Sequence, residues 1–258
     1  MTDATRQWRE WRRAPWGRLR YTQAEANLAR HLPPAPASVL DLAGGDGADA
    51  LRLARLGHRV TVVDRSAEML AEAGRAFDLA DLPVRLVRAD LAELPEDVRV
   101  EHDVVLAHNV IQYLPDPAAA LRATVGLVAP GGLLSVIALN RHAEPLRHAT
   151  QHLDPVAALA ALDTDQAHTQ TFDTSLTLYT ADQVRDWLPD WALVGHYGIR
   201  AVNDYVSDND RKHDPAFFAD LERLELALAD RMPYPLLARF FHLVLRRGNP
   251  DDGVAGIS

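Results

Sequence analysis

The sequence predicts an α/β fold: a doubly wound, mainly parallel sheet with helices on both faces. Short apolar or β-branched segments of strand length alternate with segments of helical periodicity between residues 38 and 140. This alternation implies parallel strands joined by right-handed crossovers. Polar residues follow the predicted strands, at the sheet edge where such folds bind ligands.

The elements of the first half can be placed in order after the connector "PPAPAS" (33–38). Strands are predicted over 38–43, 58–64, 84–90, 102–108 and 133–140. Helices are predicted over 49–56, stopped by Gly57, over 67–77, capped by Ser66, and over 116–129, with Pro117 in the first turn.

After residue 140 the strand–helix rhythm is lost until a capped helix over 180–188. A strand over 191–205, a helix over 215–230 and a last strand over 239–247 follow, giving seven strands. We therefore divide the chain into an N-terminal helical arm (1–35), a cofactor-binding core (36–140), a cap or insertion (141–180), the C-terminal part of the same domain (181–248) and a tail (249–258).

Composition excludes several classes of function. The 258 residues include no cysteine, which removes disulfides, thiolate nucleophiles and cysteine metal sites. No apolar run approaches the roughly 20 residues that span a bilayer, and the N-terminus lacks a secretory signal, so we expect a cytoplasmic protein without membrane contact. A net charge of −9 argues against broad adhesion to nucleic acid.

Two segments concentrate residues that could bind ligands. Residues 1–30 are rich in arginine and contain Trp8, Trp11 and Trp16, which fits either an amphipathic arm packed on the body or a basic arm facing the substrate. The insertion carries four histidines (His142, His148, His152 and His168), but none has a helical acidic partner in a clear zinc pattern, so we predict no metal site.

The stretch "VLDLAGGDGADA" (39–50) marks a nucleotide-binding turn. Its glycines fit the dinucleotide fingerprint, but Asp41, Asp46 and Asp49 would repel a pyrophosphate. The same acids suit a ligand that carries an ammonium and a sulfonium. We therefore favour S-adenosyl-L-methionine, with an NAD-linked oxidoreductase as the alternative. Asp64, at the end of the next strand, would bind ribose hydroxyls in either case.

The series "VLDLAGGDG", "VTVVD", "VRAD", "HDVVLAHNVIQYL" and "APGGLLSVIALN" resembles the class I S-adenosylmethionine-dependent methyltransferases over residues 38–140. The resemblance implies a Rossmann-like sheet whose last two strands are antiparallel. It also implies a set of cofactor-binding residues: Asp41, Ala43, Gly44, Gly45, Asp46 and Gly47 in the turn, Asp64 and Arg65 for the ribose, Asp90 and Leu91 beside the adenine, and His108 and Asn109 near the sulfonium.

A narrower resemblance covers nearly the whole chain. "WGRLR", "LNRH", "GIRAVNDY" and "ARFFHLVLRR" are similar to segments of the bacterial tRNA 5-carboxymethoxyuridine carboxyl methyltransferases. It implies that Arg20 grips the methionine carboxylate. It also implies substrate-binding residues, for which the candidates are Tyr113, Asn140, His142, Arg200, Asp204, Tyr205, Arg239 and His242. The family more often has a glycine at Ala43, and residues 141–179 match it poorly.

The expected reaction is in-line methyl transfer to a carboxylate or a hydroxyl, with the wobble 5-carboxymethoxyuridine of tRNA as the leading acceptor. A carboxylate needs an arginine clamp rather than a base. A hydroxyl or amine would more often need a base, for which His108 or His142 could serve; with Asn140, a hydrogen-bonding candidate, they are the catalytic candidates. Arg200 and Asp204 could instead form a structural ion pair. The alternatives are a small-molecule O- or N-methyltransferase and a non-catalytic S-adenosylmethionine-binding protein. The oligomeric state stays open.

Overall fold

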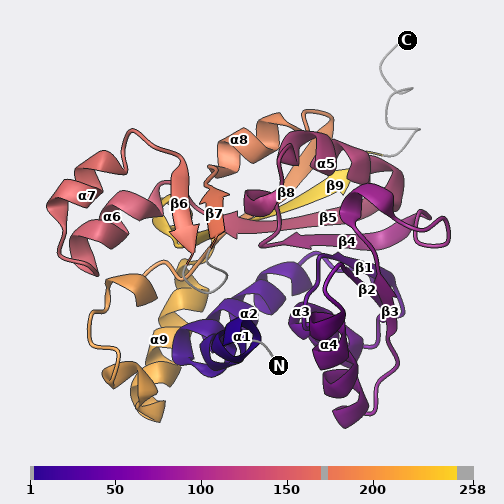
Figure 1. Ribbon diagram of the computed structural model, residues 1–258, viewed down its shortest axis with the longest axis horizontal. Coiled ribbons are helices and arrows are strands. Elements are labelled where there is room, and N and C mark those ends of the chain that lie inside the picture. Colours follow the sequence, from indigo (N-terminus) through magenta and orange to yellow (C-terminus); the bar gives the residue numbers. More distant parts are fainter. Residues whose placement is uncertain (1–2, 170–173, 249–258) are drawn as a thin grey trace.

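The computed structural model describes residues 3–169 and 174–248 and confirms the predicted α/β class (Figure 1). Its main sheet has seven strands in the order β3-β2-β1-β4-β5-β9-β8. They are β1 (Ser38–Leu42), β2 (Arg59–Asp64), β3 (Arg85–Arg88), β4 (His102–His108), β5 (Val128–Leu139), β8 (Trp191–Ile199) and β9 (Phe240–Arg247). The tail predicted at 249–258 lies outside the described residues.

The first five strands are parallel, and β9 runs antiparallel between β5 and β8. The order reverses at β1, where β2 and β3 lie on one side and β4 and β5 on the other. The carboxyl ends of β1 and β4 therefore border the crevice in which open α/β sheets bind ligands. The segments that follow β1, β2 and β4 all reach this crevice, as the sequence predicted.

Alternate residues of each strand face opposite sides of the sheet, so each face has its own apolar core. On one face, Leu40, Val105 and Leu134 pack beneath α5 (Pro117–Ala123) and α8 (Ala181–Asp186). On the other face, Val39 and Leu106 pack beneath α2 (Pro15–Ala29), α3 (Ala48–Arg55) and α4 (Ala67–Leu79). Figure 1 shows these helix layers on the two sides of the sheet.

Local caps agree with the predicted helix ends. Ser66 accepts the Met69 backbone N–H at 3.3 Å, and Thr180 forms a reciprocal capping box with Gln183. Several predicted boundaries were wrong; the strand predicted to begin at residue 133, for example, begins at Val128. The helix from Pro117 stops at Ala123 because a short 3₁₀ turn leads directly into β5. The predicted strand over 191–205 ends at Ile199, because Arg200 adopts a left-handed conformation with a φ of 61°.

The segment after β5 folds as two short helices and a hairpin. These are α6 (Ala143–Thr150), α7 (Pro155–Ala160), β6 (Gln166–Thr169) and β7 (Thr174–Thr177). The hairpin forms a separate sheet of two strands. After β8, α9 (Pro215–Leu228) and α10 (Tyr234–Leu237) lead back to β9, while α1 (Asp3–Arg13) precedes α2 at the N-terminal end. Within the described ranges, no helix has both the length and the apolar character needed to cross a membrane.

Candidate functional site

A cavity of about 860 Å³ opens at the carboxyl ends of the parallel strands. We call one part of it the glycine-turn end, which is bordered by Asp41, residues 43–46, Asp49, Asp64, Asp90 and the segment after β4. We call the other part the arginine end, which is bordered by Arg147, Gln151, Arg200, Asp204 and Arg239. The two ends therefore combine residues from the core, from the insertion and from the segment after β8.

The glycine turn is built for close approach of a ligand. Gly45 and Gly47 have φ angles of 56° and 68°, which favour glycine. At Gly44, a Cβ atom would lie 2.6 Å from the carboxyl group of Asp41. Asp64 ties the turn to the end of β2, since its carboxylate accepts the backbone N–H groups of Gly45 at 2.9 Å and Ser66 at 2.8 Å. The shape of the turn is thus held by hydrogen bonds within the protein.

The three carboxylates of the turn differ sharply in environment. Asp46 accepts hydrogen bonds from Arg12 at 2.7 Å and Trp8 at 3.2 Å. Asp49 pairs with Arg20 at 2.5 Å and with His108 at 2.9 Å. Two of the three acids that we expected to repel a pyrophosphate are therefore neutralised by cationic or polar partners. The expectation that all three acids would repel a pyrophosphate was wrong, because Asp46 and Asp49 are paired.

The charge states of Asp41 and Asp49 reflect this difference. Burial raises the pKa of Asp41 well above its ordinary value, and nearby Asp49 adds to the effect. Burial would also raise the pKa of Asp49, but Arg20 and His108 hold it well below the usual range. Of the acids of the turn, Asp41 is thus the one whose ionised form a cationic ligand would stabilise most.

The residues at the glycine-turn end fit S-adenosylmethionine. Oδ2 of Asp41 and Nε of Arg20 are buried without a hydrogen-bond partner in the described part of the chain, and both residues line the cavity. A carboxyl and a guanidinium side by side match the ammonium and carboxylate of an amino acid. The positive φ angles of Gly45 and Gly47 and the lack of a Cβ atom at Gly44 leave room for the amino acid to approach the backbone of the turn.

His108 belongs to a buried chain of hydrogen bonds that crosses three strands. Its Nδ1 contacts Asp49 at 2.9 Å, its Nε2 contacts Ser135 Oγ at 2.8 Å, and that hydroxyl contacts His242 Nε2 at 2.8 Å. Burial lowers the pKa of both histidines, that of His242 well below its ordinary value. A neutral His108 that donates to Asp49 must accept from Ser135, which in turn accepts from His242.

This order of donors and acceptors leaves Nδ1 of His242 as a bare acceptor, and that atom is indeed buried without a partner among residues 3–169 and 174–248. Both ring nitrogens of His108 are engaged. The geometry therefore gives His108 a role in holding Asp49, and no free nitrogen with which to take a proton from an acceptor.

Backbone strain gathers at the cavity. Ala43, Asn109 and Arg200 have φ angles of 53°, 55° and 61°, and all three line it. A left-handed conformation costs a residue other than glycine roughly 1–2 kcal/mol. Strain of this kind is typical of functional sites. The family that this chain resembles more often has glycine at the position of Ala43. Here alanine adopts the left-handed conformation.

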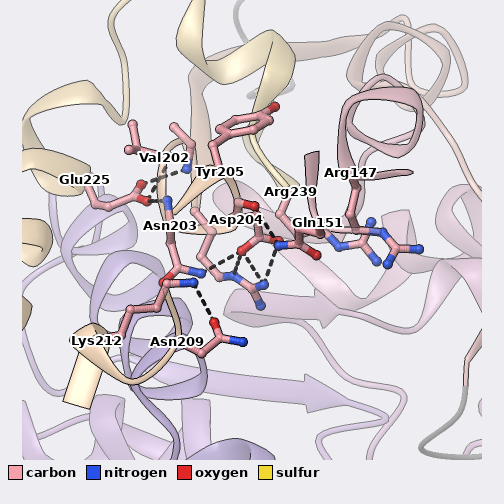
Figure 2. A network of polar contacts seen from close by, with 12 residues as sticks. Arg147, Gln151, Val202, Asn203, Asp204, Tyr205, Asn209, Lys212, Glu225 and Arg239 are labelled. Atoms are coloured by element: carbon pink, nitrogen blue, oxygen red, sulfur yellow. Dashed lines mark hydrogen bonds and ion pairs between the residues drawn. The ribbon is translucent and has the colours of Figure 1, made fainter. Parts of the chain in front are cut away.

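At the arginine end, three cations surround two buried acids. Arg200 binds Asp204 through Nε at 2.8 Å and Nη2 at 2.6 Å. Arg239 and Arg147 both contact the buried carboxylate of Glu144, Arg147 at 2.9 Å. Figure 2 shows Arg147, Gln151, Asp204 and Arg239 converging from different segments. Three positive charges against two negative ones leave this end with a net positive charge.

Burial would raise the pKa of both acids at this end. Arg239 and Arg147 instead hold the pKa of Glu144 below its ordinary value, and Arg200 with Arg239 does the same for Asp204. Both acids are therefore ionised at neutral pH and orient the arginines. The predicted ion pair of Arg200 and Asp204 is present, and both partners line the cavity as well.

The turn that carries Arg200 rests on residues that sequence reasoning missed. The carboxylate of Glu225, fully buried on α9, accepts the backbone N–H groups of Ala201 at 2.7 Å, Val202 at 2.9 Å and Asn203 at 2.6 Å (Figure 2). Gln23 of α2 accepts the Arg200 N–H at 2.8 Å. The sequence held one signal for Glu225. This charged residue lies on the apolar face of α9, in line with Phe218 and Leu221.

The predicted site residues divide into two groups. The residues that line the cavity are Arg20, Asp41, Ala43, Gly44, Gly45, Asp46, Asp64, Arg65, Asp90, Leu91, His108, Asn109, Tyr113, Arg200, Asp204 and Arg239. Those that do not are Gly47, Asn140, His142, Tyr205 and His242. Gly47 opens α3 as its N-cap.

The other four lie away from the cavity for identifiable reasons. The Asn140 amide donates to the carbonyls of Leu236 and Ala238, and the Tyr205 hydroxyl donates to that of Leu237. His242 lies inside the sheet. His142 is exposed at the start of α6. The side chains of Asn140 and Tyr205 thus hold the backbone before β9, and the contact of these four residues with substrate stays a prediction.

The chain is similar to known methyltransferases. A family model described as a methyltransferase domain matches residues 39–132. The chain is 27% identical over 248 residues to the tRNA 5-carboxymethoxyuridine methyltransferase of Escherichia coli K12, covering 92% of each chain. The match to this relative includes the insertion and the segment after β8.

Solved structures give the same fold. A cyclase, SpnF, aligns over 92% of this chain and 84% of its own with a TM-score of 0.61 and 18% identity. A S-adenosylmethionine-dependent methyltransferase from Clostridium acetobutylicum aligns over 90% and 92% with a TM-score of 0.58 and 12% identity. At these identities the likeness concerns the fold alone.

Proposed function

The chain is a S-adenosylmethionine-dependent methyltransferase, and from this premise we propose that it methylates a carboxylate, the 5-carboxymethoxy group of a wobble uridine in tRNA. The observation that carries the proposal is the arginine end of the cavity. Arg147, Arg200 and Arg239 border the same space as the glycine turn, which supports an anion site beside the proposed cofactor site.

The charges at the arginine end favour an anionic acceptor over a neutral one. Glu144 and Asp204 are ionised and hold their arginines in place, but three guanidinium groups exceed two carboxylates by one positive charge. A further carboxylate would balance that charge. Guanidinium groups bind carboxylates through paired N–H donors, which fixes the orientation of the acceptor as well as its charge.

The state of the candidate bases supports the same choice. A carboxylate is ionised at neutral pH and gives up no proton on methylation. Of the three predicted catalytic candidates, Asn140 and His142 do not line the cavity, and His108 has both nitrogens engaged. A hydroxyl or amine acceptor would have to find a base among other groups.

The chemistry then depends on positioning. S-adenosylmethionine supplies an activated methyl group on a sulfonium. Arg20 and Asp41 would hold the amino-acid portion of the cofactor, and Asp64 would hold the ribose. Arg200 and Arg239 would aim one carboxylate oxygen of the acceptor along the line of transfer. Alignment of this kind accounts for a large part of the rate in such displacements.

The proposal is tested with labelled S-adenosylmethionine and tRNA that carries free 5-carboxymethoxyuridine. We expect label in this tRNA, released as methanol by mild alkali because the product is an ester. A matched tRNA that lacks the carboxymethoxy group should take up none. If the enzyme binds S-adenosylhomocysteine but labels neither tRNA, the acceptor is wrong while the methyltransferase assignment stands.

Replacing Arg239 with alanine should reduce kcat/KM for the carboxylate acceptor about 100-fold, because a charge-assisted hydrogen bond contributes about 1.5–3 kcal/mol. The affinity for S-adenosylhomocysteine, measured by calorimetry, should stay within about twofold of wild type. Arg231→Ala, at an exposed site before α10, is the control and should leave both values unchanged. Equal acceptor kinetics in the two variants would remove Arg239 from the acceptor site.

One observation favours a second candidate, a small-molecule O- or N-methyltransferase. The net charge of −9 gives the protein no general attraction for a polyanion such as tRNA. The same arginine end would accept a small carboxylic acid. Direct labelling decides between them: small carboxylic acids offered with labelled S-adenosylmethionine should take up no label if the nucleic acid is the acceptor.

A further inference from the structure

The N-terminal helix α1 lies across the glycine-turn end of the cavity. Arg12 and Trp8, one turn apart on α1, both donate to the same oxygen of Asp46, at 2.7 Å and 3.2 Å. Arg9 pairs with Glu72 of α4 at 2.6 Å. Two of the arginines that the sequence left unassigned are therefore bonded to acids of the cofactor-binding core.

The same helix contributes two aromatic rings to the cavity wall. Trp8 and Trp11 stack with their centroids 5.0 Å apart and their planes 16° apart. Both line the cavity together with Asp41, Asp46 and Asp49. Flat aromatic faces attract cations, and S-adenosylmethionine brings a sulfonium and an ammonium to the turn.

The position of α1 depends on a specific fold-back over α2. At Gly17 a Cβ atom would lie 2.1 Å from the carbonyl oxygen of Trp11, so this helix crossing requires glycine. Asp46, under α1, is only 6% exposed, although it lies in a surface turn between two glycines. Helix α1 thus covers the turn on which the cofactor would lie.

We propose that α1 is a lid over the cofactor, latched by Arg12 and Trp8 to Asp46, and that Trp8 and Trp11 are cofactor-site residues. The latch must open for the cofactor to enter and for its demethylated product to leave. Since Arg12 and Trp8 share one carboxylate oxygen, loss of Arg12 removes the charged half of the latch. This inference concerns the cofactor alone and does not depend on the identity of the methyl acceptor.

The test measures the dissociation rate of S-adenosylhomocysteine by stopped-flow. Arg12→Ala should release the ligand at least tenfold faster than wild type, and Gly17→Ala should do the same by displacing α1 with the latch residues intact. Arg13→Ala, an exposed neighbour on the same helix, is the matched control and should release it at the wild-type rate. Equal rates in Arg12→Ala and Arg13→Ala would overturn the lid.

A second measurement leaves the charged latch intact. Two of the five tryptophans, Trp8 and Trp11, line the cavity, so the tryptophan fluorescence of the wild type should change when S-adenosylhomocysteine binds. In the double variant Trp8→Phe and Trp11→Phe this change should be lost, while calorimetry still detects binding. A full fluorescence change in the double variant would mean that these rings do not meet the ligand, and would exclude them from the cofactor site.

Discussion

Replacing Arg20 with alanine is expected to weaken both the fold and cofactor binding. Arg20 is 1% exposed and pairs with Asp49 at 2.5 Å. Removing one member of a buried ion pair leaves the other uncompensated and typically costs about 3–5 kcal/mol. In a chain of this size that lowers the melting temperature by about 10 °C. The affinity for S-adenosylhomocysteine should fall about 10- to 100-fold, because the ligand loses a charge-assisted partner.

Arg20→Lys separates the two effects. Lysine keeps the charge beside Asp49 but lacks the planar fork that serves two carboxylates at once. We therefore expect most of the lost stability to return, while the affinity stays low. Calorimetry and thermal melting measure the two quantities separately. If Arg20→Ala binds the ligand as tightly as wild type, Arg20 belongs to the fold and not to the cofactor site.

The Arg20 pair also sets a pH dependence. The pKa of Asp49 is lower in the folded protein than in the unfolded chain, where it is about 3.9. The pair therefore stabilises the fold fully above about pH 4, and this contribution is lost as the pH falls towards the folded pKa. The difference in melting temperature between wild type and Arg20→Ala should be largest at neutral pH and should shrink below about pH 4.

Replacing Glu225 with alanine is the second change from which we expect a large effect. Three backbone N–H groups, of Ala201, Val202 and Asn203, would lose the carboxylate that accepts them. An unsatisfied buried donor costs about 1–3 kcal/mol, so the loss of stability should reach about 3 kcal/mol or more. The same turn holds Arg200, so kcat/KM for the acceptor should fall while cofactor affinity changes little.

The control for Glu225 lies on the same helix. Glu222→Ala removes a partly exposed carboxylate of α9 and should change stability by less than about 0.5 kcal/mol. Glu225→Gln retains one acceptor oxygen and should fall between wild type and alanine. Denaturant unfolding of the three variants measures the order. A Glu225→Ala protein as stable as Glu222→Ala would show that the turn finds other partners.

The sequence predicted the sheet and the glycine-turn end of the site because their signals are local. Strand periodicity, caps such as Ser66 and the glycines of residues 44–47 act within a few residues of one another. In a parallel sheet the residues after each strand then meet at one edge without further information. Asp46, Asp64 and Asp90 could be placed at this edge for that reason.

The remaining features depend on partners far apart in the chain. Asn140 and Tyr205 were predicted to bind substrate, yet they hold the backbone around residues 236–238. Glu144 and Glu225 organise the arginine end and the Arg200 turn, and neither was predicted. Which buried acid meets which arginine is decided by how the insertion and α9 pack, and hydrophobic periodicity carries no information on that.

The hydrogen-bond chain from Asp49 through His108 and Ser135 to His242 has a consequence for how such proteins can evolve. His242 donates to Ser135, Ser135 to His108 and His108 to Asp49, so a lone change to an apolar residue leaves a buried group unsatisfied at a cost of about 1–3 kcal/mol. Replacing His108, Ser135 and His242 together by apolar residues of matching volume would avoid most of that cost. Related sequences should therefore keep or lose these three residues as a set, and their covariation would be visible without any structure.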